Sequence, residues 1–110
     1  MNNLITDEMD KDHNGFPNLE TYGFCLWIGN NDILHKLTFH FMNDHHVIPS
    51  DVQPLVAAME LLSNAGGKVD TNASPAWRMS IDMGSAPDCF TKVDSVFLAD
   101  WLNEEFEPVA

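Results

Sequence analysis

Apolar residues that recur at helical spacing, in series preceded by helix-capping residues, are the feature that most constrains the fold. The clearest series follows Ser50, a good N-cap. Its members would form one stripe along a helix: Val52, Leu55, Val56, Met59 and Leu62. We expect Pro54 to be tolerated in the first turn of this helix. We expect Gly66-Gly67 to end it.

Two more helices are expected upstream. Residues 18–28 begin with Asn18 as N-cap and carry Glu20 in the first turn, where the helix dipole favours an acid. The run up to Ile28 is apolar on all sides, so periodicity does not separate a buried helix from a buried strand, and the cap favours a helix that stops at Gly29-Asn30. Asn31 would then cap the next helix, with a recurring apolar set: Ile33, Leu34, Leu37 and Phe41.

The C-terminal part predicts one extended segment and one helix. Residues 77–83 alternate large apolar with polar side chains, which is the period of a half-buried strand. The last helix should run from about Asp94 to Glu105, capped by Asp94 or Thr91, and its apolar residues cluster on one side: Phe97, Leu98, Trp101, Leu102 and Phe106. Glu105 intrudes on that apolar arc, so we expect the helix to fray there.

These segments predict a mainly α fold. It would be a small single-domain bundle of about four helices with one short extended segment, and an α+β class stays open. Residues 1–17 are polar and turn-rich and are expected to form a flexible acidic arm, whereas residues 18–110 form the globular domain. Residues 68–76 resemble a linker in composition.

The charge balance limits the partners. Seventeen Asp and Glu stand against five Lys and Arg, a formal net charge of -12 in 110 residues. Such a surface repels nucleic acid and anionic membranes and attracts cationic proteins. A hydrophobic content of 45% nevertheless supports a real core rather than disorder. Only two cysteines occur and no apolar leader is visible, so we expect a reduced protein of the cytoplasm.

One stretch, residues 14–32, carries a recognisable pattern. It contains Asn14-Gly15-Phe16, Asn18-Leu19-Glu20-Thr21-Tyr22 and Leu26-Trp27-Ile28, followed by Asn31-Asp32. The stretch resembles the N-terminal signature of a family of small proteins of phages and mobile elements, with Tyr22 in place of the usual Trp and Leu19 in place of the usual Tyr. The acidic segment 99–105 is similar to the short helix that often closes such proteins. The resemblance implies a mobile-element origin and small helical elements, and it implies no catalytic residues.

Metal binding is not supported by the motifs. Residues 10–15 match the first half of an EF-hand loop, but its twelfth position is Thr21, which cannot supply a bidentate carboxylate. The histidines lack the spacing of a zinc pair, with His35 and His40 five residues apart and His45 and His46 adjacent. We expect these to be surface histidines, with one partly buried beside Phe39 and Phe41. No metal ligands and no cofactor are therefore predicted.

Catalysis is not supported either. Cys25 lies in an apolar run that should raise the pKa of its thiol and leave it inert, and the charge of Asp88 should disfavour a Cys89 thiolate. Nucleotide-binding and nucleophile-elbow motifs are absent from the sequence. We expect no catalytic residues and no enzymatic activity.

The sequence instead favours a binding function. An acidic face could occupy the Lys/Arg groove of a nucleic-acid-binding host protein, such as a CRISPR effector or a restriction enzyme, by mimicking DNA. The candidate residues come from the last helix and the N-terminal arm: Asp94, Asp100, Glu104, Glu107, Asp7, Glu8, Asp10 and Asp12. Two alternatives stay open: a phage accessory protein that forms a homodimer through Trp27, Trp101 and their neighbours, and a Ca²⁺ or other metal-binding module.

Overall fold

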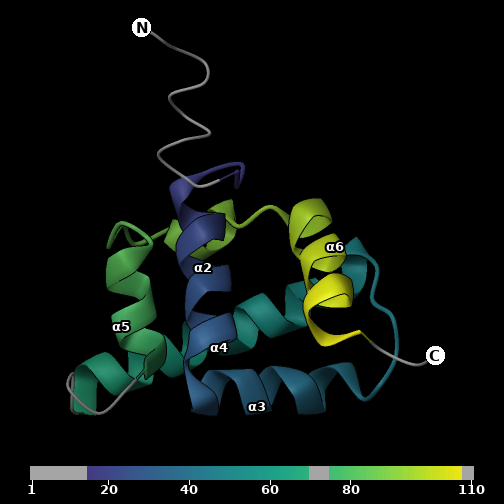
Figure 1. Ribbon diagram of the computed structural model, residues 1–110. Helices are drawn as coiled ribbons and strands as arrows, with labels where there is room; N and C mark the ends of the chain where they lie inside the picture. The colour runs from purple at the N-terminus through teal and green to yellow at the C-terminus, as the bar shows by residue number, and fades with distance from the viewer. Residues whose placement is uncertain (1–14, 70–74, 108–110) are drawn as a thin grey trace, which may run out of the picture.

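The described part of the chain is helical. The computed structural model describes residues 15–69 and 75–107. Within these ranges lie five α-helices, one 3-10 helix and no strand: α2 (Leu19–Asn30), α3 (Asp32–Met42), α4 (Pro49–Val69), α5 (Pro75–Asp82), η1 (Cys89–Lys92) and α6 (Ser95–Phe106) (Figure 1). The mainly α class predicted from the sequence is confirmed.

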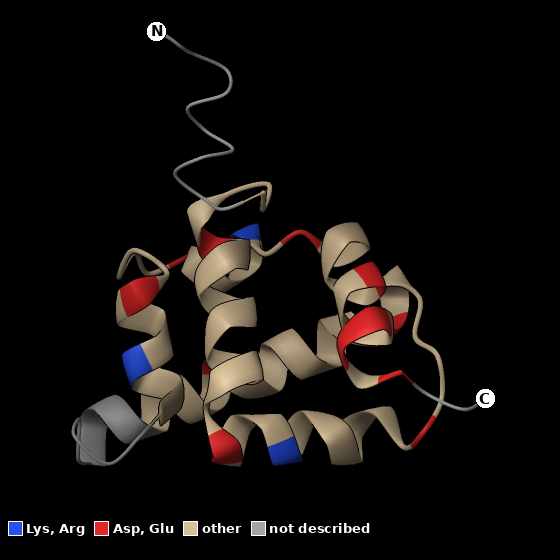
Figure 2. Cartoon of the chain, viewed as in Figure 1, with Lys and Arg blue, Asp and Glu red and all other residues tan. Residues whose placement is uncertain are grey.

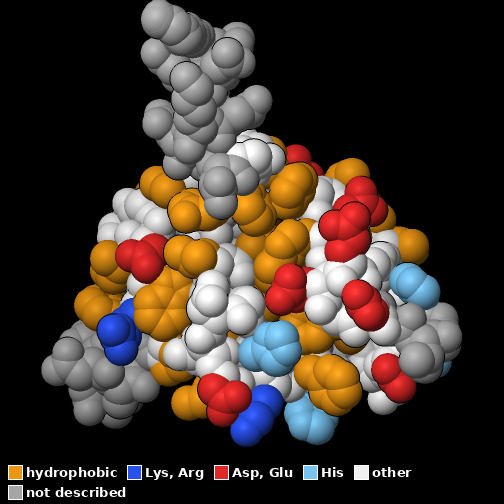
Figure 3. Space-filling model, in the orientation of Figure 1, with side chains coloured by type: hydrophobic (Ala, Val, Ile, Leu, Met, Phe, Trp, Pro, Cys, Tyr) orange, Lys and Arg blue, Asp and Glu red, His pale blue; other side chains and the backbone are white. Residues whose placement is uncertain are grey.

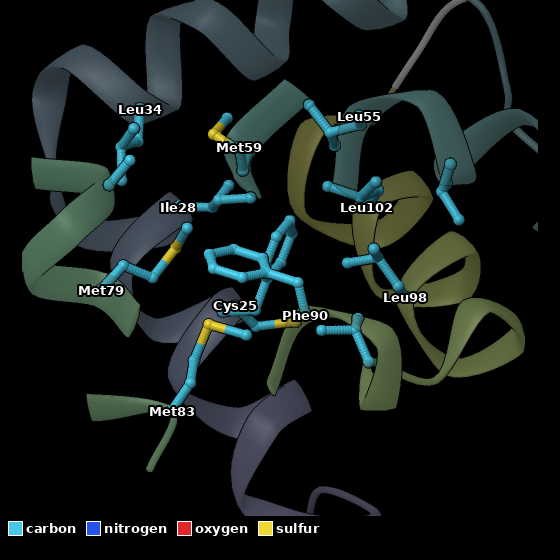
Figure 4. Packing of buried hydrophobic residues seen from close by; sticks show 14 of the residues in the cluster. Cys25, Ile28, Leu34, Leu55, Met59, Met79, Met83, Phe90, Leu98 and Leu102 are labelled. Carbon is cyan, nitrogen blue, oxygen red and sulfur yellow. The ribbon is translucent and has the colours of Figure 1, made fainter. Parts of the chain in front are cut away.

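Helix α2 lies at the centre of the bundle. It packs against α3, α5, η1 and α6, while α4 crosses the bundle and contacts both α5 and α6 (Figure 1). Phe24, Cys25 and Ile28 are fully buried on one face of this helix, whereas the apolar Leu26 on another side is 39% exposed. Figure 4 shows Cys25 and Ile28 among residues of the surrounding helices, including Met79 of α5 and Leu102 of α6.

Side-chain caps set the helix starts, as predicted. Asn18 accepts a hydrogen bond from the Thr21 N–H at 2.8 Å, and Asn31 accepts one from Leu34 at 3.1 Å. Asp94 accepts one from the Phe97 N–H at 3.0 Å, so it is the cap of α6, whereas Thr91 lies within η1. Each oxygen satisfies a backbone donor that the first helical turn leaves without a partner.

The extended segment expected at 77–83 is wrong, because α5 covers Pro75–Asp82. Proline at the first helical position has the φ angle that a helix needs and no N–H to leave unpaired. The buried residues are Ala76, Met79 and Met83, spaced by three and four, while Ile81 is 45% exposed. The alternating residues of this segment therefore also fit a helical period, and packing against α2 and α4 favours the helix.

Helix α4 also differs from its prediction. It begins at Pro49, so Ser50 lies inside it, and Asp51 accepts a hydrogen bond from the N–H of Ile48 at 3.0 Å. Pro54 lies inside the helix beyond its first turn. The predicted stop at residues 66–67 fails because the helix continues to Val69.

The buried face of α4 is shifted from the predicted stripe. Val52, Leu55 and Met59 are buried as expected, but Leu62 is 45% exposed and Ser63 takes the next inward position with 3% exposure. Helix α4 makes extensive contact with α5.

The proposed arm and linker lie mostly outside the described residues. Residues 1–14 and 70–74 are not described. At the edge of the arm, Phe16 is half-buried, with its ring 5.4 Å from Tyr22 and 5.0 Å from Phe97, centroid to centroid. Phe16 thus belongs to the packed domain. The ends of the predicted linker are helical, since α4 reaches Val69 and α5 starts at Pro75.

Candidate functional site

Helix α6 presents an acidic surface. Asp100 and Glu104 are exposed one turn apart, and Glu105 is exposed beside Glu104. Glu107 is also exposed, but it lies past the last turn as the C-cap, in the left-handed conformation with φ 44°. Figure 2 shows acidic residues along α6 with no basic residue on that helix.

The structure separates Asp94 from these acids. Asp94 is the N-cap of α6, about 9 Å from Asp100 and about 15 Å from Glu104 along the helix axis by helical rise. Its carboxylate caps the helix, and its backbone N–H donates to Thr21 Oγ1 at 2.9 Å. Asp94 therefore has a structural role as a cap, and its part in partner binding stays a prediction. The other four candidates, Asp7, Glu8, Asp10 and Asp12, lie outside the described residues.

The acidic side chains of α6 form no ion pair with a described Lys or Arg. In the described ranges the ion pairs join Lys36 to Asp32 at 3.2 Å and Lys92 to Asp88 at 3.9 Å, and neither involves α6. Glu104 and Glu105 occupy the last turn, where the negative end of the helix dipole disfavours acids by about 0.3–1 kcal/mol each. Asp100 and Glu104 also repel each other at i, i+4, at a cost of about 0.2–0.5 kcal/mol.

A hollow lies between α2 and α6, beside this surface. Its volume is about 240 Å³. Aromatic rings, a glycine and one carboxylate are among its lining residues: Phe16, Tyr22, Trp101, Gly29 and Glu105. Figure 3 shows apolar side chains over α2 adjoining acidic side chains toward α6 on this face.

Sequence reasoning missed this hollow. The position of Glu105 within the apolar side of the last helix predicts fraying there, but α6 stays helical to Phe106. Trp101 and Glu105 approach Gly29: a Cβ built on that glycine would be 3.6 Å from the indole ring and 3.9 Å from Oε2 of Glu105. The absent side chain of Gly29 therefore leaves room next to both groups.

A second hollow of about 370 Å³ lies on the other side of Leu26 and Asn30, lined also by Trp27, Asn31 and Asp82. Trp27 donates from Nε1 to Asp82 at 2.6 Å. The guanidinium carbon of Arg78 lies 5.4 Å from the centre of the same indole, within the range of a cation–π contact. Trp27 is thus engaged by side chains of its own chain.

Both cysteines are buried free thiols. Burial raises the pKa of Cys25 far above its usual range, and the charge of Glu105 acts in the same direction. The predicted rise in the pKa of Cys25 is confirmed. For Cys89 the cause is different from the one expected: burial chiefly raises its pKa, with smaller contributions from Glu20 and Glu60, and Asp88 is not among the causes.

The described histidines do not gather into a metal site. In residues 15–69 and 75–107, no three His, Cys, Asp or Glu side chains are placed to hold a metal ion. The partly buried histidine is His35, whose ring stacks on Phe106 at 4.6 Å; His40, beside Phe39, is exposed.

The EF-hand-like segment can be assessed only at its edge. Its first five residues, 10–14, lie outside the described ranges, and Gly15 has a positive φ of 89°. Thr21, at the twelfth loop position, is fully buried and its hydroxyl oxygen accepts from the Asp94 N–H. That residue therefore serves the packing of α2 against the start of α6.

Comparison with known proteins yields no relative. No family model matches the chain, and neither a curated protein nor a solved structure is significantly similar to it. Among the described helices, none combines the length and the apolar character that crossing a membrane would require.

Proposed function

We propose that the protein is a non-enzymatic inhibitor of a host defence machine that handles nucleic acid, a CRISPR effector or a restriction enzyme. In this proposal it is a phage or mobile-element protein that acts in the cytoplasm of the host bacterium. The acidic surface of α6, formed by Asp100, Glu104, Glu105 and Glu107, would occupy the cationic groove that normally holds nucleic acid. The chain would thus act as a DNA mimic.

The observation that carries this proposal is the placement of the α6 acids. Carboxylates at the C-terminal end of a helix lower its stability, and here no basic side chain of α6 offsets them. Solubility does not require this arrangement, because the same acids would be less costly in a first turn. A local rule broken without a compensating contact is typical of a functional surface.

The geometry is compatible with phosphate mimicry. Asp100 and Glu104 lie one turn apart on an exposed face, so their Cβ atoms are about 6 Å from each other, comparable with the distance between successive phosphates on a strand. The net charge of -12 would steer the chain toward a cationic groove over long range. Binding driven in this way is fast and is weakened by salt.

The proposal is tested first by phage infection. Host strains would each carry one CRISPR effector or restriction enzyme directed against the same phage, and plaquing would be compared with and without the protein. We expect plaquing to recover in one defence background. Recovery should be lost in the variant Asp100→Asn, Glu104→Gln, Glu107→Gln.

A matched control keeps the same change in net charge. The control variant is Glu20→Gln, Asp32→Asn, Asp88→Asn, whose acids lie outside α6. It should inhibit like the wild type if the surface of α6 matters, whereas equal loss in both variants would show that only the total charge matters. No recovery in any background, or full recovery with the α6 variant, would contradict the proposal.

The responding defence protein would then be purified and its binding measured as salt is raised. A steep loss of affinity supports mimicry of a polyanion. A tight complex that is insensitive to salt would refute that mechanism. Sedimentation of the inhibitor alone would reveal whether self-association competes as an explanation.

A further inference from the structure

The hollow between α2 and α6 has a chemistry that the acidic surface alone does not. Its walls include the rings of Phe16, Tyr22 and Trp101, all half-buried. Glu105 lines it with an exposed carboxylate, and no described Lys or Arg pairs with that group. Aromatic walls with one unpaired carboxylate suit a ligand that is apolar along its length and cationic at its end.

The chain already holds one of its own arginines over a tryptophan ring. On the far side of Leu26 and Asn30, Arg78 lies over the ring of Trp27, and Asp82 accepts the indole hydrogen bond. Trp101 and Glu105 also line a common hollow, but among the described residues no Lys or Arg pairs with Glu105 or lies over Trp101. Trp27 thus has a guanidinium partner from its own chain, whereas Trp101 has none among the described residues.

We propose that the hollow lined by Trp101 and Glu105 receives an arginine side chain from the partner protein. The aliphatic stem would pack against Tyr22 and Trp101, and the guanidinium would pair with the carboxylate of Glu105. This inference rests on the proposed function for the partner's chemistry, since a nucleic-acid groove is rich in Arg. It adds one anchored contact to an interface that otherwise depends on long-range charge.

The volume of the hollow favours a single side chain. The volume of about 240 Å³ is below the roughly 300–1,000 Å³ of pockets that hold small-molecule ligands. Arginine suits the site better than lysine because its planar guanidinium stacks on aromatic rings and can pair with a carboxylate through two hydrogen bonds.

The test uses the purified protein and three capped tripeptides, Gly-Arg-Gly, Gly-Lys-Gly and Gly-citrulline-Gly, at low salt. The readout is the indole N–H resonance of Trp101, assigned with the variant Trp101→Phe, and Trp77 provides an internal reference. We expect a saturable shift with the arginine peptide, with affinity in the millimolar range. The neutral citrulline peptide should bind up to about fivefold more weakly, because it lacks the ion pair.

Two variants locate the site. Glu105→Gln should weaken the arginine peptide roughly fivefold, the upper end for an exposed ion pair, whereas Glu104→Gln changes the charge equally but does not line the hollow. Gly29→Ala should abolish the saturable shift, because its Cβ would enter the space beside Trp101, at an ordinary contact distance of 3.6 Å. A melting curve would establish that this variant is folded.

Several results would overturn the inference. These are equal binding of the citrulline or lysine peptide, equal effects of the Glu104 and Glu105 variants, or unchanged binding by Gly29→Ala. Failure of the peptide test with successful phage protection would reject the arginine site and keep the proposed function. The reverse pattern would keep the arginine site and reject the proposed function.

Discussion

Gly23 of α2 lies against the C-terminal end of α5, and adding one methyl group there should destabilise the protein. A Cβ at this position would lie 2.9 Å from Cγ of Met83, 3.0 Å from the carbonyl oxygen of Asp82 and 3.1 Å from its carbonyl carbon. The Met83 side chain can move, but the Asp82 contacts are backbone. Gly23→Ala therefore forces α5 away from α2 or deforms one of the two helices.

The magnitude follows from two opposing effects. Alanine is favoured over glycine inside a helix by about 1 kcal/mol. Overpacking of a filled core costs about 1–3 kcal/mol, and a contact with backbone belongs at the upper end. The net loss in the free energy of unfolding should be about 1–2 kcal/mol, or a fall in Tm of roughly 4–8 °C for a chain of this size.

Urea and thermal unfolding followed by circular dichroism would measure this loss. Gly29→Ala is the matched control on the same helix, because its Cβ would meet Trp101 at 3.6 Å, an ordinary contact. It should gain about 0.5–1 kcal/mol from the helical preference of alanine. Equal or greater stability of Gly23→Ala than of wild type would refute the reasoning, as would equal losses at the two glycines.

Three further predictions concern single side chains. Asn103→Ala should lower the free energy of unfolding by about 1–3 kcal/mol, because the Asn103 side chain accepts from the N–H of Val47 and donates to its carbonyl, each at 2.9 Å. Urea unfolding would measure this loss, and a loss under about 0.5 kcal/mol would contradict the role of these two hydrogen bonds. Asp94→Ala should cost about 1 kcal/mol through the lost cap, with Asp94→Asn as the conservative control; equal losses in both would point to the charge instead. Cys25 should resist alkylation in the folded state. Because burial raises the pKa of its thiol, the contribution of Cys25 to stability should be present at neutral pH and should decline as the pH rises above about 8.5, where the thiol of the unfolded chain ionises. Unfolding of Cys25→Ser and wild type between neutral and alkaline pH would check this, and parallel pH profiles would count against it.

The starts of helices were predictable because a cap is a local event. Asn18, Asn31 and Asp94 each bond a backbone N–H three residues along the chain, so the sequence contains both partners. The stretch 77–83 was not predictable in the same way. Its residues fit both a strand period and a helical one, and only contact of Met79 and Met83 with neighbouring helices decides between them.

In the candidate site, too, some features were predictable from local sequence and others depended on tertiary structure. The exposed acids Asp100 and Glu104 were predictable from their helical spacing, since the opposite side of α6 is apolar. Asp94 differs from them in that its carboxylate caps the start of the helix, so its place in an acidic binding face stays a prediction. The hollow could not be predicted, because its walls come from α2 and α6, whose residues are some 70 positions apart in sequence.

The sequence by itself therefore determined the helical class, three caps and the excess of acid, all of which depend on residue type and on neighbours within one or two helical turns. Tertiary structure alone decided that residues 75–82 are helical and that α4 continues through two glycines. It also decided that Trp101 and Glu105 line a hollow beside Gly29. The physical reason is that burial depends on which distant segments meet, and the free energy of that packing outweighs local preference.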